Sequence, residues 1–136
     1  MKYFNLRVYE ADGVFAKGEA ESVVVPTFDG EYGVMAHHEN LVVSIVPGML
    51  KYRMKGGEDR VAAVSSGMMR VEDNDVLIIV ESAERPEDID AERSKEAEAE
   101  AREEMLRKKS EEDYFLAEAT LIRAINRLKV KNRGGS

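Results

Sequence analysis

The stretch Asp88-Ile89-Asp90-Ala91-Glu92-Arg93 opens the part of the sequence that decides the fold. From Pro86 to Arg133 glycine is absent and β-branched residues are rare, while Ala, Glu, Lys and Arg dominate. Residues 1–85 are instead rich in valine and glycine and are punctuated by turn signals. This change in composition predicts two domains of different secondary structure.

Residues 1–85 have the pattern of a small all-β domain. Phe4, Leu6 and Val8 alternate with other residues, which is typical of a half-buried strand. Turn signals such as Asp12-Gly13 and Gly56-Gly57 separate further short apolar segments at 23–25, 34–35, 41–46, 49–55, 61–64, 69–71 and 76–80. Short strands with turns about every 8–12 residues predict a sandwich or flattened barrel.

Residues 86–133 have the pattern of an antiparallel helical hairpin. Pro86 and the acidic residues after it predict a helix start, and the helical pattern continues to Lys109. Ser110 to Asp113 resembles a cap that starts a second helix, which runs to about Lys131. The fold class is therefore α+β with two domains, and residues 134–136 form a tail.

The predicted seam of the hairpin is weak on its first helix. A narrow stripe there consists of Ala97, Ala101 and Met105, extended by Asp90 and Ser94. The stronger apolar face of the second helix is formed by Tyr114, Ala117, Leu121, Ala124, Ile125 and Leu128. An alanine seam buries little apolar surface, so we expect the hairpin to dock loosely and to move.

Composition excludes several classes of protein. The 136 residues include no cysteine, which excludes disulfides and thiolate metal sites. The net charge of −7 disfavours a general nucleic-acid binder. No apolar run approaches the roughly 20 residues of a membrane-spanning helix, and the N-terminus lacks a signal peptide, so we expect a cytoplasmic protein.

Two clusters contain side chains that are able to bind a ligand. His37 and His38 beside Glu39 allow a metal or acid–base site, but adjacent side chains of an extended segment point in opposite directions. A loop that contacts another protein, or an ordinary turn, is therefore favoured, and no metal is expected. Arg93, Arg123 and Arg127 are predicted to meet at the open end of the hairpin, where guanidinium groups suit phosphate. The alternative is that these arginines pair with surface glutamates.

The order and spacing of several motifs resemble the epsilon subunit of bacterial F-type ATP synthase over nearly the whole chain. The matching segments are Gly30 to Val34 with His38, Pro47-Gly48-Met49, Ser65-Ser66-Gly67 before Met69-Arg70-Val71, Ala83-Glu84-Arg85, Asp88 to Arg93, and Arg123 to Leu128. The resemblance implies a ten-stranded sandwich, a two-helix hairpin, and a non-catalytic rotor subunit without catalytic residues.

The resemblance also implies partners and a location. The sandwich would bind the gamma subunit and sit on the membrane ring of c subunits, with Glu31 and His38 in the ring-facing loop. The hairpin would lie folded, or extend to the alpha and beta subunits and block ATP hydrolysis. Arg123, Arg127, Lys129 and Lys131 would then face acidic segments. The location would be the cytoplasmic face of the cell inner membrane.

The resemblance further implies a regulatory ATP site, with or without Mg²⁺, and no required cofactor. Its residues would be Glu84, Ile89, Asp90, Arg93, Arg123 and Arg127. Ser94 stands where the motif has alanine, and Glu100 where nucleotide-binding members can have arginine, which should weaken triphosphate binding. Ala36-His37 also replaces the usual Pro-Gly, and Ser66 the first of two usual glycines.

Three alternatives stay open at this point. The first is a free-standing ATP-sensing module, the second an enzyme that uses paired carboxylates and His38, and the third a β-sandwich adaptor outside any rotary ATPase.

Overall fold

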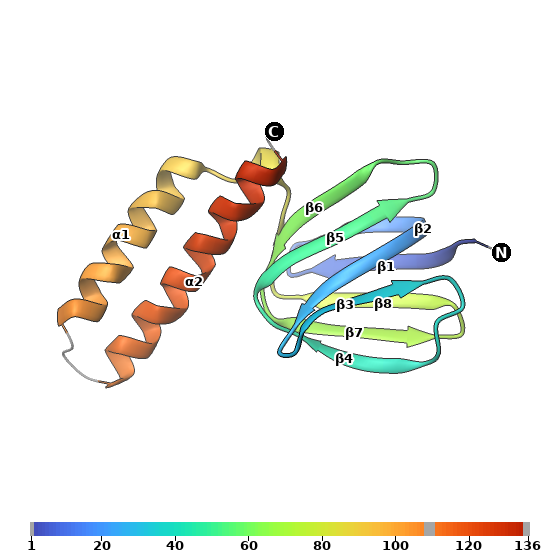
Figure 1. Cartoon of the computed structure of the whole chain (residues 1–136), viewed down its shortest axis with the longest axis horizontal. Helices are drawn as coiled ribbons and strands as arrows, with labels where there is room; N and C mark the ends of the chain where they lie inside the picture. The colour runs from blue at the N-terminus through green and yellow to red at the C-terminus, as the bar shows by residue number, and fades with distance from the viewer. Residues whose placement is uncertain (1, 108–110, 135–136) are drawn as a thin grey trace. The chain divides into compact units, whose positions relative to one another are not determined.

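The computed structural model describes residues 2–107 and 111–134, with the side chains of 107 and 111–113 excepted. The chain divides into two compact units, Met1–Glu84 and Arg85–Ser136. The predicted cap at Ser110 and most of the predicted tail lie outside the described residues. The first unit is a β-sandwich and the second a two-helix hairpin, so the predicted fold class is confirmed (Figure 1).

The sandwich contains nine strands among its described residues, one fewer than the resemblance implies. They are β1 Phe4–Glu10, β2 Gly13–Thr27, β3 Gly30–Met35, β4 Leu41–Ile45, β5 Gly48–Met54, β6 Asp59–Val64, β7 Gly67–Glu72, β8 Asp75–Val80 and β9 Ala83–Glu84. Their order is β4-β7-β8-β1-β2-β5-β6-β9, and β3 pairs with β2. The β1–β8 pairing is parallel and all other pairings are antiparallel.

Strand β2 corrects the prediction of a short strand at 23–25. It spans 15 residues, because its first half pairs with β1 while its second half pairs with both β5 and β3. Gly18 has φ +146°, a conformation that glycine adopts without steric cost. Pro26 does not stop the strand; it pairs with Glu31, and its carbonyl accepts a hydrogen bond from the Val46 N–H at 3.1 Å.

The core of the sandwich lies between its two layers. The side chains that alternate inward along β1 and β8 are fully or nearly fully buried: Phe4, Leu6, Val8, Val76, Ile78 and Val80. Leu50, Met69, Val23 and Val25 complete this core from the neighbouring strands. Burying each side chain of this size stabilises the fold by about 1.5–3 kcal/mol, so this core is the main source of the stability of the sandwich.

The hairpin begins with a 3₁₀ turn, η1 Pro86–Asp88, and not with the predicted α-helix. Helix α1 spans Ala91–Arg107 and α2 spans Glu111–Gly134. The two helices pack side by side and antiparallel, as Figure 1 shows. Four of their buried side chains are small, Ser94 and Ala101 on α1 and Ala117 and Ala124 on α2, as the predicted seam has them. Val130 of α2 is also buried, whereas Asp90, predicted to extend the stripe, is exposed.

Candidate functional site

The start of α1 is organised by Asp90. Its carboxylate Oδ1 accepts a hydrogen bond from the Arg93 backbone N–H at 3.2 Å, the geometry of a helix N-cap. The preceding Ile89 is buried, while the side chains of Asp90 and Arg93 are exposed. Lys131 Nζ donates a hydrogen bond of 3.0 Å to the Pro86 carbonyl, which ties the end of α2 to the start of the hairpin.

The three candidate arginines lie towards the same end of the hairpin. Arg93 is in the first turn of α1, and Arg123 and Arg127 are one turn apart in the second half of the antiparallel α2. Among the described residues, neither Arg93 nor Arg123 has an ion-pair partner, whereas Arg102 pairs with Glu98 at 3.1 Å. Within the described part of the chain, Arg93 and Arg123 therefore have no glutamate partner, and the alternative of arginines paired with surface glutamates stays open for the cluster as a whole.

Glu84, the remaining predicted nucleotide residue, belongs to the other unit. It lies in β9, where it pairs with Ala63 of β6 and is half-buried. The residues that the hairpin itself contributes are therefore Ile89, Asp90 and the three arginines, and the buried Ile89 positions the turn through packing.

The loop after β3 holds its histidines by hydrogen bonds. His38 Nδ1 lies 2.8 Å from the Glu39 carbonyl oxygen and must donate, because a carbonyl only accepts. His38 Nε2 therefore accepts from the Tyr32 hydroxyl at 3.1 Å. The His37 backbone N–H donates to Asn74 Oδ1 at 2.7 Å. Both ring nitrogens of His38 are occupied, and the described part of the chain has no cluster of three metal-ligating side chains.

Glu31 and His38 are the two predicted ring contacts. Glu31 is the second residue of β3 and pairs with Lys51 at 2.9 Å, whereas His38 lies three residues beyond the end of that strand. The His38 ring contacts the ring of Tyr32, the residue after Glu31, and 3.1 Å separates its Nε2 from the Tyr32 hydroxyl.

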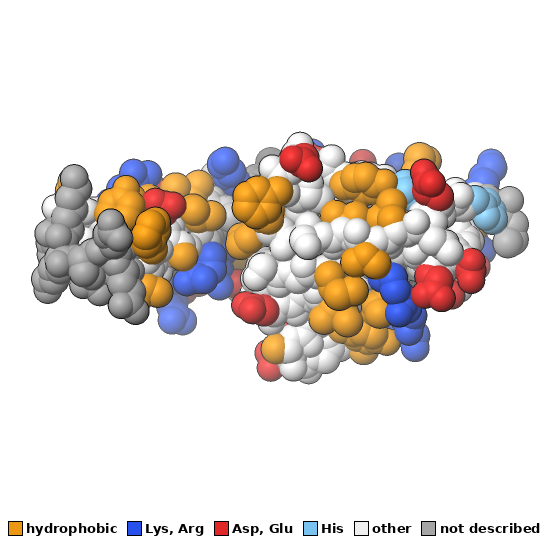
Figure 2. Space-filling model, turned by 90° about the horizontal axis from the view of Figure 1, so that it is seen from below, with side chains coloured by type: hydrophobic (Ala, Val, Ile, Leu, Met, Phe, Trp, Pro, Cys, Tyr) orange, Lys and Arg blue, Asp and Glu red, His pale blue; other side chains and the backbone are white. Residues whose placement is uncertain are grey.

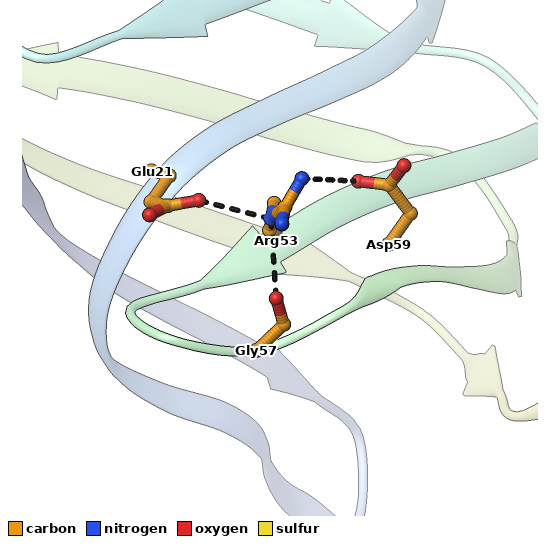
Figure 3. A network of polar contacts seen from close by, with 4 residues as sticks. All are labelled: Glu21, Arg53, Gly57 and Asp59. Carbon is orange, nitrogen blue, oxygen red and sulfur yellow. Dashed lines mark hydrogen bonds and ion pairs between the residues drawn. The ribbon is translucent and has the colours of Figure 1, made fainter.

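The outward face of the layer that contains β2, β3 and β5 is covered by ion pairs. Lys51 pairs with Glu31, and Lys55 pairs with Glu19 at 3.1 Å. Between them, Arg53 Nε lies 2.9 Å from Glu21 and donates to the Gly57 carbonyl, while Asp59 is 3.8 Å from its Nη1 (Figure 3). The three cations of β5 and the turn after it are thus each paired with a carboxylate of this face.

The outward face of β4, β7, β8 and β1 has a different character. Its outward side chains include Val42, Met68, Leu77, Ile79 and Tyr9, and the register places Met68 next to Ile79 and Ile79 next to Tyr9. Arg7 and Arg70 also point outward on this face, one on each side of Leu77. Ile79 is 45% exposed and Val42 66% exposed. Figure 2 views the sandwich from the side on which β4 lies and shows hydrophobic side chains gathered there, bordered by charged ones. We call this surface the apolar face.

Sequence reasoning missed the apolar face. Its signal was present in β8, where Leu77 and Ile79 make the outward positions as hydrophobic as the inward ones. Contiguous exposed apolar surface of this kind marks interaction sites in proteins.

Comparison with known proteins matches both units. Residues 3–86 match the family model described as ATP synthase, Delta/Epsilon chain, beta-sandwich domain. Residues 87–132 match the one described as ATP synthase, Delta/Epsilon chain, long alpha-helix domain.

Curated relatives and solved structures agree with these matches. The ATP synthase epsilon chain of Caldicellulosiruptor saccharolyticus is 38% identical over 130 residues, covering 96% of this chain and 94% of the relative. The epsilon chain of Shouchella clausii is 39% identical over 136 residues, covering both chains in full. A chain of the Euglena gracilis mitochondrial ATP synthase OSCP/F1/c-ring structure superposes with a TM-score of 0.82 at 25% identity, over 100% of this chain and 83% of its own length.

The described helices include none that is both long and apolar enough to cross a membrane.

The comparisons agree on one family. Two family domains together span nearly the whole chain, and bacterial relatives match it over nearly their full length at more than 30% identity. The chain belongs to the family of ATP synthase delta/epsilon chains, and it is an epsilon-type, non-catalytic subunit of the central stalk in the F1 sector.

Proposed function

We propose that this subunit couples rotation of the central stalk to ATP synthesis by binding the gamma subunit through the apolar face. The observation that carries this proposal is the contrast between the two outward faces of the sandwich. One is neutralised by the ion pairs of Lys51, Arg53 and Lys55, and the other presents Val42, Met68 and Ile79 to solvent. Arg7 and Arg70 lie beside Leu77 on the same face, and Met, Tyr and Arg are among the residues that are enriched at the core of interfaces.

The membrane ring of c subunits is the second partner in this proposal. Glu31, near the start of β3, and His38, whose ring contacts Tyr32, are the positions that we assign to that contact. Charge reversal at Glu31 and, separately, replacement of His38 by Ala test the two positions, because loss of either contact should reduce coupled ion pumping. The same proposal locates the subunit at the cytoplasmic face of the cell inner membrane, as a peripheral component.

The hairpin acts as the regulatory element. It inhibits ATP hydrolysis when it extends towards the alpha and beta subunits, and folding back on itself releases the inhibition. Most of its buried side chains are small, and beside Ser94, Ala101, Ala117 and Ala124 only Ile89 and Val130 are buried among the described residues, so it has little apolar surface to lose when it rearranges. A modest ligand effect is then enough to shift its conformation.

ATP is the ligand that we propose for the folded hairpin, with Arg93, Arg123 and Arg127 on its phosphates. Arg93 and Arg123 have no ion pair with any described residue, which supports this role, because these guanidinium groups then need not give up such a partner to bind phosphate. A ligand present at about ten times its Kd, and bound only by the folded form, stabilises that form by about 1.4 kcal/mol. This changes the ratio of folded to extended hairpin about tenfold.

A single set of measurements tests the assembly and the regulation. The chain should co-purify with the gamma subunit, and Met68→Glu on the apolar face should abolish the complex. Met35→Glu is the matched control, because Met35 is an exposed methionine of β3 on the ion-paired face. ATPase assays of the assembled head should show higher hydrolysis when residues 86–136 are removed. Failure of the wild-type chain to bind gamma would favour the free-standing module.

A further inference from the structure

The apolar face contains a hollow of about 460 Å³ at one end of its strands. Glu10 at the end of β1 and Glu81 directly after β8 line it, with Ser66, Gly67, Met68 and Ile79. Backbone hydrogen bonds hold its rim, since the Glu81 N–H donates to the Ser66 carbonyl at 3.2 Å and the Ala11 N–H to the Glu81 carbonyl at 3.3 Å. The hollow is thus built on paired strands.

The charges around this hollow are unbalanced. Neither Glu10 nor Glu81 has a cationic partner among the described residues. On the opposite layer, by contrast, Glu21 pairs with Arg53 and Glu31 with Lys51, each at 2.9 Å. Two carboxylates therefore flank walls formed by the apolar side chains of Met68 and Ile79. Such a combination matches a side chain with an apolar stem and a cationic head.

We infer that this hollow receives an arginine or lysine side chain of the protein that docks on the apolar face. The inference rests on the proposed function, in which that protein is the gamma subunit, and adds the chemistry of the contact. The stem would lie against Met68 and Ile79, and the charged head would reach the Glu10 and Glu81 carboxylates. Because docking excludes water from the hollow, the charge pairing there is stronger than at an exposed surface.

The experiment measures the affinity of the full chain for the gamma subunit at low and high salt. The double variant Glu10→Gln/Glu81→Gln removes both charges and keeps the size of the side chains. We expect its Kd to rise about tenfold or more at low salt, and its affinity to depend less on salt than that of wild type. Glu58→Gln, at an exposed acid outside the apolar face, is the control and should stay within about twofold of wild type.

The outcomes separate this inference from the proposal on which it rests. If Met68→Glu abolishes binding while the double variant binds as wild type does, with the same salt dependence, the apolar face stands and the cationic contact is wrong. If the wild-type chain does not bind gamma, both are wrong. Thermal unfolding of each variant shows whether it is folded, and we expect no loss of stability because neither the Glu10 nor the Glu81 side chain has a hydrogen bond or ion pair with a described residue.

Discussion

The Asp90 carboxylate caps α1 by accepting a hydrogen bond from the Arg93 backbone N–H at 3.2 Å. These residues are also two of the predicted nucleotide contacts, so a single substitution there changes the helix start and the candidate site together. Variants of Asp90 must therefore distinguish its two roles.

Asp90→Ala removes the cap and should destabilise the hairpin by about 1 kcal/mol. Asp90→Asn keeps a capping oxygen and removes only the charge. If Asp90 acts through the cap alone, Asp90→Asn should retain ATP binding and helix stability while Asp90→Ala loses both, measured by calorimetry and circular dichroism. Loss of ATP binding in both variants, with normal stability in Asp90→Asn, would instead assign the carboxylate to the ligand.

Arg123→Ala should weaken ATP binding about tenfold or more, because a charge-assisted hydrogen bond contributes about 1.5–3 kcal/mol. Arg102→Ala is the matched control, since Arg102 is an exposed hairpin arginine already paired with Glu98. Calorimetry of both variants and of wild type with ATP measures the effect. Absence of heat at millimolar ATP in all three would remove the nucleotide from the proposal.

Gly67→Ala should destabilise the sandwich by about 1–3 kcal/mol or more, the usual cost of overpacking. A Cβ at Gly67 would lie 2.0 Å from the Ile79 carbonyl oxygen and 2.8 Å from Val80 Cα, so the backbone of β8 would have to shift. Gly33→Ala is the control, because its nearest neighbour would be Val24 Cγ2 at an ordinary 3.7 Å. Urea unfolding compares the two, and equal stability would contradict the close β7–β8 approach.

Arg53→Ala should cost no more than about 1 kcal/mol, because its ion pairs with Glu21 and Asp59 are exposed to solvent and screened. Leu50 lies three residues before Arg53 on the same strand, but its side chain is fully buried. Leu50→Ala should therefore cost about 2–5 kcal/mol. Denaturant unfolding in low and high salt measures both. A cost at Arg53 as large as that at Leu50 would mean that the ion pairs hold the layer together.

Amide hydrogens of α1 should exchange faster than those of β1 and β8. The hairpin buries mainly Ala and Ser in its seam, whereas the two strands bury Phe4, Leu6 and Ile78. Hydrogen exchange with and without nucleotide measures the difference. Equal protection of helices and strands in both conditions would leave a static hairpin with no regulatory movement.

The elements with a clear period were predictable from the sequence. The alternation of Phe4, Leu6 and Val8 defined β1, and the seam of Ala101, Ala117 and Ala124 follows from helical spacing. Local sequence patterns did not predict the strand ends that depend on pairing with other strands. Strand β2 continues past Pro26 because β3 pairs with it there. The start of α1 was placed too early because the acids after Pro86 suit a 3₁₀ turn as well as an α-helix.

The candidate sites were predictable in part, for a similar reason. The spacing of Arg123 and Arg127 fixes their position on one helix, and the antiparallel packing brings Arg93 to the same end. The apolar face could not be predicted from the sequence. An apolar run such as 76–80 looks the same whether the strand is buried on both faces or leaves one face exposed to solvent. The strand order shows that β8 lies in an outer layer of the sandwich, so that no other described strand of the sandwich covers its outward side chains.

The long strand β2 has a mechanical consequence. A single uninterrupted length of backbone is shared between the two halves of the sandwich, paired with β1 in its first part and with β5 and β3 in its second. Separating the two halves requires breaking the backbone hydrogen bonds along this one strand. We therefore expect the sandwich to resist a pulling force and to unfold as a single cooperative unit.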